Sequence, residues 1–198
     1  RDALDELDRA AGLGAVLNKV LPNAMVFDPA DKSLAPVWRK MSDLGLPLLS
    51  HIGFEFTLIG HDQSVGFPER LVPSFDAGVK VIAAHGCSNG IFFNEPHLKT
   101  MDALMAKYPN FYVDLSALTL PNRVGALLRL ARRPELAGRF LFGTDYPLPC
   151  LSYPALAGGL GAFWAAFRAG NKFDTQAAVL EGLGLAPAAD PAKVLRLR

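Results

Sequence analysis

Hydrophobic residues gather into five short runs that recur about every thirty residues along the chain. The runs read GAVLNKV (14–20), PLLSHI (47–52), VKVIAAH (79–85), NFYVDLSA (110–117) and RFLFGTD (139–145). They contain few alternating polar positions, which is typical of parallel strands that are covered on both faces. Segments with helical spacing of apolar residues separate them, so the pattern predicts repeated strand–helix units around a parallel sheet.

Turn and capping residues set the expected limits of the helices between these runs. We expect helices over 2–12, 33–44, 68–78, 97–109, 121–133, 152–169, 174–182 and 190–197. Ser33 is expected to cap the second helix and Gly45 to end it, and Asp190 is expected to cap the last. Residues 21–33 and 53–67 are predicted as loops, since both are irregular and the first is rich in Pro, Asn and Asp.

Most of the predicted strands end on a side chain that can hold a metal ion or move a proton. These side chains are Lys19, His51, His85, Asp114 or Ser116, and Asp145. In a parallel β/α barrel the carboxyl ends of the strands surround one mouth, where the active site forms. Imidazole nitrogens and carboxylate oxygens both suit zinc and similar divalent ions, so His51, His85 and Asp145 are candidate ligands.

Four further residues are candidates for contact with a substrate. A strand-end lysine needs a partner, so Lys19 is expected to bind an anionic group, to bridge two metal ions once carboxylated, or to pair with an acidic side chain. Glu55 and His61 lie in the loop after the second strand, and Asn89 follows the third. Loops at this end of a barrel shape the substrate pocket. His97, by contrast, follows a proline at a helix start and is expected at the surface.

The bulk properties narrow the classes of function. The chain has 198 residues, of which 51% are hydrophobic and 20% charged, so we expect one domain, 1–198, with a real core. A net charge of +1 gives no reason to expect nucleic acid or a membrane as partner. Two cysteines make no disulfide framework, which favours a reducing, cytoplasmic setting.

The first residues read as the middle of a larger protein, since they enter a helix without Met or lead-in.

Three segments carry a resemblance to a known family. LGLPLLSHIG, VIAAHGCS and FLFGTDYPLP resemble the fifth-, sixth- and eighth-strand motifs of the amidohydrolase superfamily. The similarity is greatest to the branch of TIM-barrel metal-dependent hydrolases related to aminocarboxymuconate-semialdehyde decarboxylase. NKVLPNAMVFDP resembles the fourth-strand segment of that branch, and the similarity covers essentially the whole chain. The resemblance implies an α/β fold of the TIM-type (β/α) barrel class.

The resemblance also implies roles for the strand-end residues. His51 would be a metal ligand, His85 an acid/base or a second ligand, Asp145 a ligand and base, and the ion zinc. The family's first strand carries a His-x-His pair, which none of the four histidines of this chain forms. Only the last five βα units are expected here, and five units cannot close an eight-stranded barrel. Such a chain exposes strand edges, so we expect it to form a homo-oligomer.

The functional hypothesis is therefore a metal-dependent hydrolase of a small amide, ester or lactone. The ion would lower the pKa of its water, Asp145 would accept a proton, and His85 would stabilise charge or protonate the leaving group. Within the same fold, the alternative is decarboxylation of a small carboxylated substrate. Outside enzymes, the alternative is a degenerate barrel that binds a ligand or partner as a scaffold.

Overall fold

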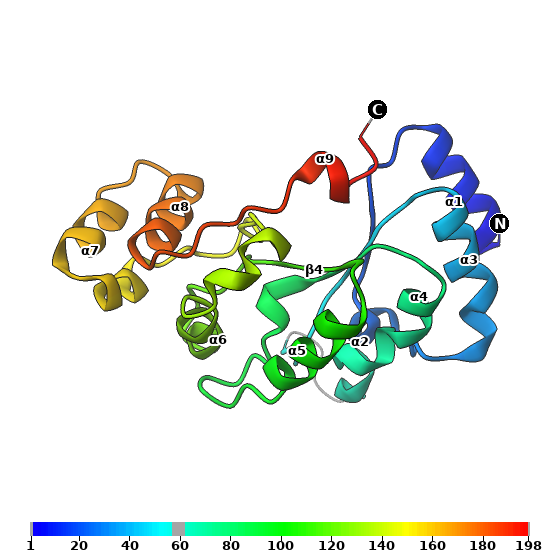
Figure 1. Cartoon of the computed structure of the whole chain (residues 1–198), viewed down its shortest axis with the longest axis horizontal. Helices are drawn as coiled ribbons and strands as arrows, with labels where there is room; N and C mark the ends of the chain where they lie inside the picture. Colours follow the sequence, from blue (N-terminus) through cyan, green and yellow to red (C-terminus); the bar gives the residue numbers. More distant parts are fainter. Residues whose placement is uncertain (1, 57–61, 198) are drawn as a thin grey trace.

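A curved parallel sheet lies at the centre of the molecule, with helices packed along it (Figure 1). The computed structural model describes residues 2–56 and 62–197. The sheet has five strands in chain order, β1 (Asn18–Val20), β2 (Leu48–Ser50), β3 (Val81–Ala83), β4 (Phe111–Asp114) and β5 (Phe140–Leu141). Every neighbouring pair is parallel, which confirms the prediction of repeated strand–helix units.

The strands are shorter than the hydrophobic runs that predicted them. Each has two to four residues in the sheet, because residues at one or both ends of each run lie outside it. In the third run, residues Ala84–Cys87 form a 3-10 turn, η4, in which His85 has the left-handed φ of 59°. The predicted limit at residue 85 was therefore wrong, because apolar character continues past the last hydrogen-bonded pair.

Helices follow most of the strands, broadly as predicted. They are α1 (Ala3–Gly12), α2 (Pro22–Met25), α3 (Ala35–Asp43), α4 (Val72–Asp76), α5 (His97–Lys107), α6 (Val124–Leu130), α7 (Leu160–Phe167), α8 (Lys172–Gly182) and α9 (Pro191–Val194). Short 3-10 segments are η1 (Lys32–Leu34), η2 (Gln63–Gly66), η3 (Pro68–Leu71), η5 (Pro134–Arg139) and η6 (Tyr153–Gly158). The last helix begins as expected, with the Asp190 carboxylate accepting the N–H of Ala192 at 3.0 Å.

Two predictions about local structure were wrong. Residues 21–33 are not loop throughout, because Pro22 occupies the first position of α2, where its missing N–H costs nothing. Ser33 is not a helix cap, because the carboxylate of Asp31 takes that part and accepts the Ser33 N–H at 2.8 Å. Gly45 does end α3, in the left-handed conformation expected after a helix.

The register of the sheet separates two faces. Leu48, Val81 and Phe111 are paired partners, are fully buried, and belong to the main core against the helices. Because successive strand residues point to opposite faces, their neighbours Leu49, Ile82 and Tyr112 line the other face. There α9 covers the sheet, and its Val194 is buried in a small cluster with Ile82. The candidate site lies at the carboxyl ends of the strands.

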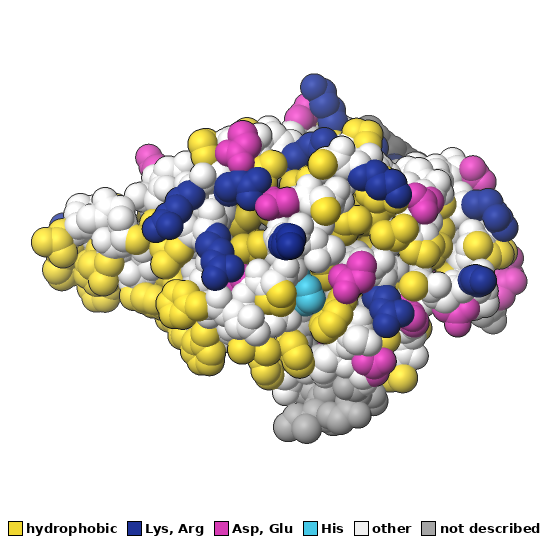
Figure 2. All heavy atoms as spheres, turned by 60° about the horizontal axis from the view of Figure 1, so that its bottom comes forward, with side chains coloured by type: hydrophobic (Ala, Val, Ile, Leu, Met, Phe, Trp, Pro, Cys, Tyr) yellow, Lys and Arg dark blue, Asp and Glu magenta, His cyan; other side chains and the backbone are white. Residues whose placement is uncertain are grey.

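The segments η6, α7 and α8 form one end of the molecule (Figure 1, left). Figure 2 shows many hydrophobic side chains at that end (left). The exposed members include Leu156, Leu160, Trp164 and Phe167. The expected homo-oligomer stays a prediction.

None of the helices within 2–56 and 62–197 is both long and apolar enough to cross a lipid bilayer.

Candidate active site at the carboxyl ends of the strands

A cavity of about 260 Å³ opens at the carboxyl ends of the strands. The residues in its lining that can carry chemistry are Lys19, His51, Glu55, His85, Arg123 and Asp145. Five of these six were singled out from the sequence; Lys19 lies in β1, and the other four follow β2, β3 and β5. His61, also a sequence candidate, lies outside the described residues.

The two strand-end histidines face one another. The rings of His51 and His85 are in edge contact, with centroids 5.0 Å apart. His51 Nδ1 lies 3.2 Å from His85 Nε2. The other ring nitrogen of His51, Nε2, lies 3.9 Å from Glu55 Oε2 and has no hydrogen-bond partner within the described chain. A buried nitrogen without a partner is costly, and His51 Nε2 is therefore available to a further group.

His85 is held from the opposite side by β4. Its backbone N–H donates to Asp114 Oδ1 at 3.0 Å, and this contact fixes the left-handed turn in which His85 sits. On the ring, Nδ1 lies 2.9 Å from Ser116 Oγ. The Ser116 hydroxyl in turn donates to Asp114 Oδ1 at 2.6 Å. Backbone and ring of His85 are thus tied to the same carboxylate.

Asp145 completes the group from the loop after β5. Its Oδ2 lies 4.0 Å from His85 Nε2, and its Oδ1 lies 3.8 Å from Lys19 Nζ. Like His85, Asp145 has a left-handed backbone, with φ of 59°. Such conformations cost free energy, and they concentrate where a side chain must be aimed for function. The pair with Lys19 is long and partly exposed, so it contributes little to stability.

Burial keeps both imidazoles uncharged at neutral pH. It lowers the pKa of His51 to about 4, helped by the nearby cation of Arg123 and opposed by Glu55. It also lowers the pKa of His85 well below its ordinary value, with further contributions from Arg123, His51 and Lys19. A neutral imidazole offers a lone pair, which is what a metal ligand or a proton acceptor requires.

Arg123 is a charged residue of the cavity lining that the sequence analysis missed. It directly precedes α6, is 5% exposed and lines the cavity. Its Nη1 donates to the backbone oxygen of Ser88 at 3.3 Å. Burial lowers its pKa, whereas the carboxylates of Glu95, Asp145 and Glu55 raise it. The available signal was a lone arginine in LPNR, between a strand and a helix at the barrel's active end.

Two residues differ from their expected placement. Asn89 is buried, its amide donates to the oxygen of Asn94 at 3.3 Å, and it is not among the residues that line the cavity. His97 is not at the surface: it is 5% exposed, and its ring packs against Phe67 at 4.6 Å between centroids. The expectation for His97 was wrong because Phe67, thirty positions away, covers the start of α5.

The donor set fits part of a metal coordination shell. Two ligand nitrogens on one tetrahedral zinc, each at roughly 2.0–2.1 Å, lie about 3.3 Å apart, and His51 Nδ1 and His85 Nε2 are separated by 3.2 Å. The Asp145 carboxylate is the third donor of suitable chemistry. Within 2–56 and 62–197, however, no group of three or more His, Cys, Asp or Glu is gathered tightly enough to hold an ion.

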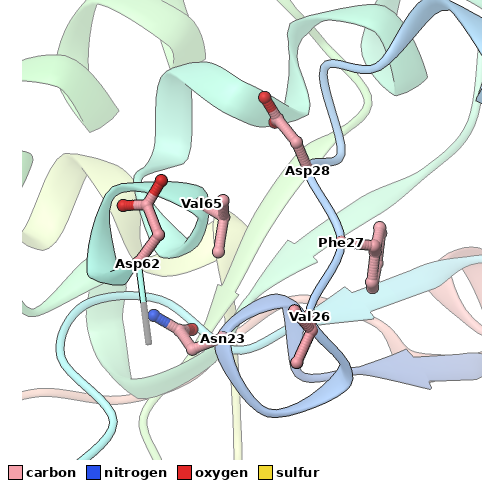
Figure 3. A pocket seen from close by; sticks show the side chains of 6 residues that line it. All are labelled: Asn23, Val26, Phe27, Asp28, Asp62 and Val65. Carbon is pink, nitrogen blue, oxygen red and sulfur yellow. The ribbon is translucent and has the colours of Figure 1, made fainter. Parts of the chain in front are cut away.

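A second cavity, of about 130 Å³, lies apart from these residues. Its lining residues are Asn23, Val26, Phe27, Asp28, Asp62 and Val65. Its two carboxylates, Asp28 and Asp62, do not point toward one another (Figure 3). Asp28 accepts from Arg70 at 3.1 Å, and Asp62 caps η2. These acidic groups are already satisfied, so the strand-end cavity is the candidate site.

Comparison with known proteins agrees with this geometry. The sequence profile of the amidohydrolase family matches residues 1–182. The chain belongs to the amidohydrolase family. A comparison with curated protein sequences found no match.

Solved structures share the fold of this amidohydrolase chain. An uncharacterised TIM-barrel protein of Bordetella bronchiseptica is 22% identical, with a TM-score of 0.59 over 91% of this chain and 59% of its own. A proposed metal-dependent hydrolase of Lactobacillus casei is 18% identical, with a TM-score of 0.54 over 96% of this chain and 57% of its own. The expected fold, a TIM-type barrel present in part, is confirmed.

A third structure extends the comparison. A proposed 2-pyrone-4,6-dicarboxylic acid hydrolase of Pseudomonas putida is 12% identical, with a TM-score of 0.54 over 91% of this chain and 68% of its own. The amidohydrolase chain therefore spans about three fifths to two thirds of the length of these structures.

Proposed function

We propose that these residues form one side of the active site of a metal-dependent hydrolase that acts on a small amide, ester or lactone. The observation that supports this most is the meeting of His51, His85 and Asp145, from three separate strands, around one cavity. Membership of the amidohydrolase family supports the same reaction class.

The proposed role of each residue follows from its position in the cavity. His51 and Asp145 would hold a divalent ion, with zinc as the expected metal, and His85 Nε2 would be either a further ligand or the acid/base. When bound, such an ion supplies a nucleophile at neutral pH by lowering the pKa of water, and it polarises the substrate carbonyl. Asp145 accepts the proton of the attacking water. If His85 Nε2 does not hold the ion, its lone pair, 4.0 Å from Asp145 Oδ2, is placed to receive that proton and to pass it to the leaving group.

The cations of the cavity favour a substrate that carries a carboxylate. Arg123 is buried in the lining, and Lys19 reaches the same space from β1. A buried guanidinium binds a carboxylate through two parallel hydrogen bonds, which also fixes the substrate's orientation. The same observation supports the second candidate, a decarboxylase, in which the carboxylate is the group that leaves.

Metal uptake by the purified chain tests the first step of the proposal. The chain is dialysed against Zn²⁺ or Mn²⁺, and bound metal is measured by elemental analysis. We expect uptake by the wild type and loss of uptake in His51→Ala and in Asp145→Ala. His97→Ala removes a buried histidine outside the cavity and serves as the matched control, with uptake unchanged. A folded wild-type chain that takes up no metal would instead support the scaffold hypothesis.

Turnover of a matched substrate panel tests the reaction itself. Small lactones, esters and amides are compared with and without a carboxylate, and the products are analysed for the ring-opened acid or for CO₂. We expect hydrolysis, with an activity loss of about 10²- to 10⁴-fold in Asp145→Ala. Arg123→Met should raise KM for the carboxylated members and leave KM for the neutral members unchanged. Release of CO₂ without hydrolysis would replace the hydrolase by the decarboxylase.

A further inference from the structure

The carboxylate of Asp114 collects three hydrogen bonds on one oxygen. Oδ1 accepts the backbone N–H of His85 at 3.0 Å, the backbone N–H of Ser116 at 3.0 Å and the Ser116 hydroxyl at 2.6 Å. A backbone N–H can only donate, so this oxygen is an acceptor. The Ser116 hydroxyl has one proton, and its contact with Oδ1 is the shortest of the three. The proton of Ser116 is therefore committed to Asp114.

That commitment decides which nitrogen of His85 carries a proton. Ser116 Oγ also contacts His85 Nδ1 at 2.9 Å, and with its own proton used it can only accept there. Nδ1 of His85 must then be the N–H donor. In the neutral ring the lone pair is left on Nε2, which is the nitrogen that faces His51 Nδ1 and Asp145.

The surroundings of Ser116 leave it little freedom to adopt another arrangement. Ser116 is 5% exposed, and Asp114 is 9% exposed. At Gly143, on the neighbouring β5 segment, an added Cβ would lie 3.2 Å from the Ser116 Cβ and 3.7 Å from the Asp114 Cβ. The two loops thus approach closely because residue 143 has no side chain.

We propose that Asp114 and Ser116 are positioning residues, which hold His85 with Nδ1 protonated and with the Nε2 lone pair directed into the cavity. Only the use made of that lone pair rests on the proposed function. His85 is then an acceptor or ligand in the resting site. It can protonate a leaving group only after Nε2 has gained a proton, taken from water directly or through Asp145, and Nε2 returns to the lone-pair form when that proton leaves.

Long-range ¹H–¹⁵N NMR of the uniformly labelled chain tests the assignment without any activity. Four histidines give few signals, and His85→Gln identifies those of His85. We expect the unprotonated type of ¹⁵N signal at Nε2 and the protonated type at Nδ1 in the wild type. The opposite tautomer in the folded wild type overturns the proposal, whether or not the chain has any enzymatic activity.

Variants show whether the two residues cause this state. Ser116→Ala and Asp114→Ala should move the proton of His85 to Nε2 in a measurable share of molecules. Asp114→Asn should retain the wild-type signals, because its amide oxygen can accept the same hydrogen bonds. Ser74→Ala is the matched control, since Ser74 in α4 is also buried but donates to the backbone oxygen of Leu71. Unchanged His85 signals in folded Ser116→Ala would contradict the proposal.

Turnover adds a second readout if the proposed function holds. Outer residues that orient a catalytic or ligating histidine typically contribute about 10- to 100-fold. We expect Ser116→Ala to lower kcat by about that factor with KM nearly unchanged, and Asp114→Asn to recover most of it. A rise in KM alone would show that Ser116 acts on substrate binding and not on His85.

Discussion

Gly53 lies where the loop after His51 presses against the loop after His85, and its replacement by alanine should be severe. Its φ is +86°, a region that residues with a Cβ adopt at a cost of roughly 1–3 kcal/mol. The new Cβ would lie 2.7 Å from the backbone oxygen of Asn89, and closer still to that of Ser88. Backbone atoms cannot rotate away as a side chain does, and overpacking of this kind costs about 1–3 kcal/mol.

The two costs together predict that Gly53→Ala destabilises the fold by about 2–6 kcal/mol, a large share of the roughly 5–15 kcal/mol available to a domain. Gly45→Ala separates the backbone cost from the overpacking cost, since Gly45 has φ of +61° but no atom within 4 Å of an added Cβ. Only the backbone cost should remain there. Equilibrium unfolding in urea measures both, as a shift in midpoint at unchanged m-value.

The result also bears on the site. The oxygen of Asn89 accepts the N–H of Phe54 at 3.0 Å, and the oxygen of Ser88 accepts from Arg123. A shift of this backbone moves the partner of the buried arginine, so Gly53→Ala should also weaken the binding of carboxylated substrates. If Gly53→Ala and Gly45→Ala prove equally destabilising, the close approach of the two loops does not exist and the reasoning is refuted.

Three further outcomes follow from the buried groups. The pKa of His51 falls from 6.5 to about 4 on folding. Stability that is present above pH 6.5 is therefore lost as the pH drops toward 4, by at most about 1.4 kcal/mol per pH unit. Urea midpoints measured against pH should fall less steeply in His51→Gln than in the wild type, and equal slopes would show that His51 does not cause the loss. Cys87 is fully buried and its burial raises the pKa of the thiol, so iodoacetamide followed by mass spectrometry should label the half-buried Cys150 first, and earlier labelling of Cys87 in the native chain would contradict this. His97→Ala removes a buried ring that packs on Phe67, and should lower the free energy of unfolding by about 1–3 kcal/mol; an unchanged urea midpoint would show that this contact is not stabilising.

The sequence predicted the order and type of the main elements because strand and helix periods leave clear marks in the hydrophobic pattern. It also predicted that His51, His85 and Asp145 would come from strand ends, since parallel strands bring those ends to one edge. It overestimated strand lengths, because a buried loop such as 84–87 is as apolar as the strand before it. The hydrophobic pattern does not show at which residue the backbone hydrogen bonds of a strand stop.

Orientation of side chains was beyond the sequence. The direction of the His85 ring depends on a left-handed turn. It also depends on the hydrogen bond from the His85 backbone N–H to Asp114, which lies twenty-nine positions later in the chain. Arg123 was missed because a single arginine in a loop resembles any solvated surface charge until its burial is seen. Asn89 was expected to contact substrate from its position alone, whereas its amide is used within its own loop.

The left-handed backbone at His85 and Asp145 implies a trade-off between durability and activity. Glycine occupies that region without a steric penalty, and asparagine tolerates it better than most residues. Exchange of either residue for glycine would therefore relieve local strain while it removes the chemical group. Engineering for thermal stability alone would therefore favour glycine at these two positions, at the cost of the imidazole and the carboxylate that line the cavity.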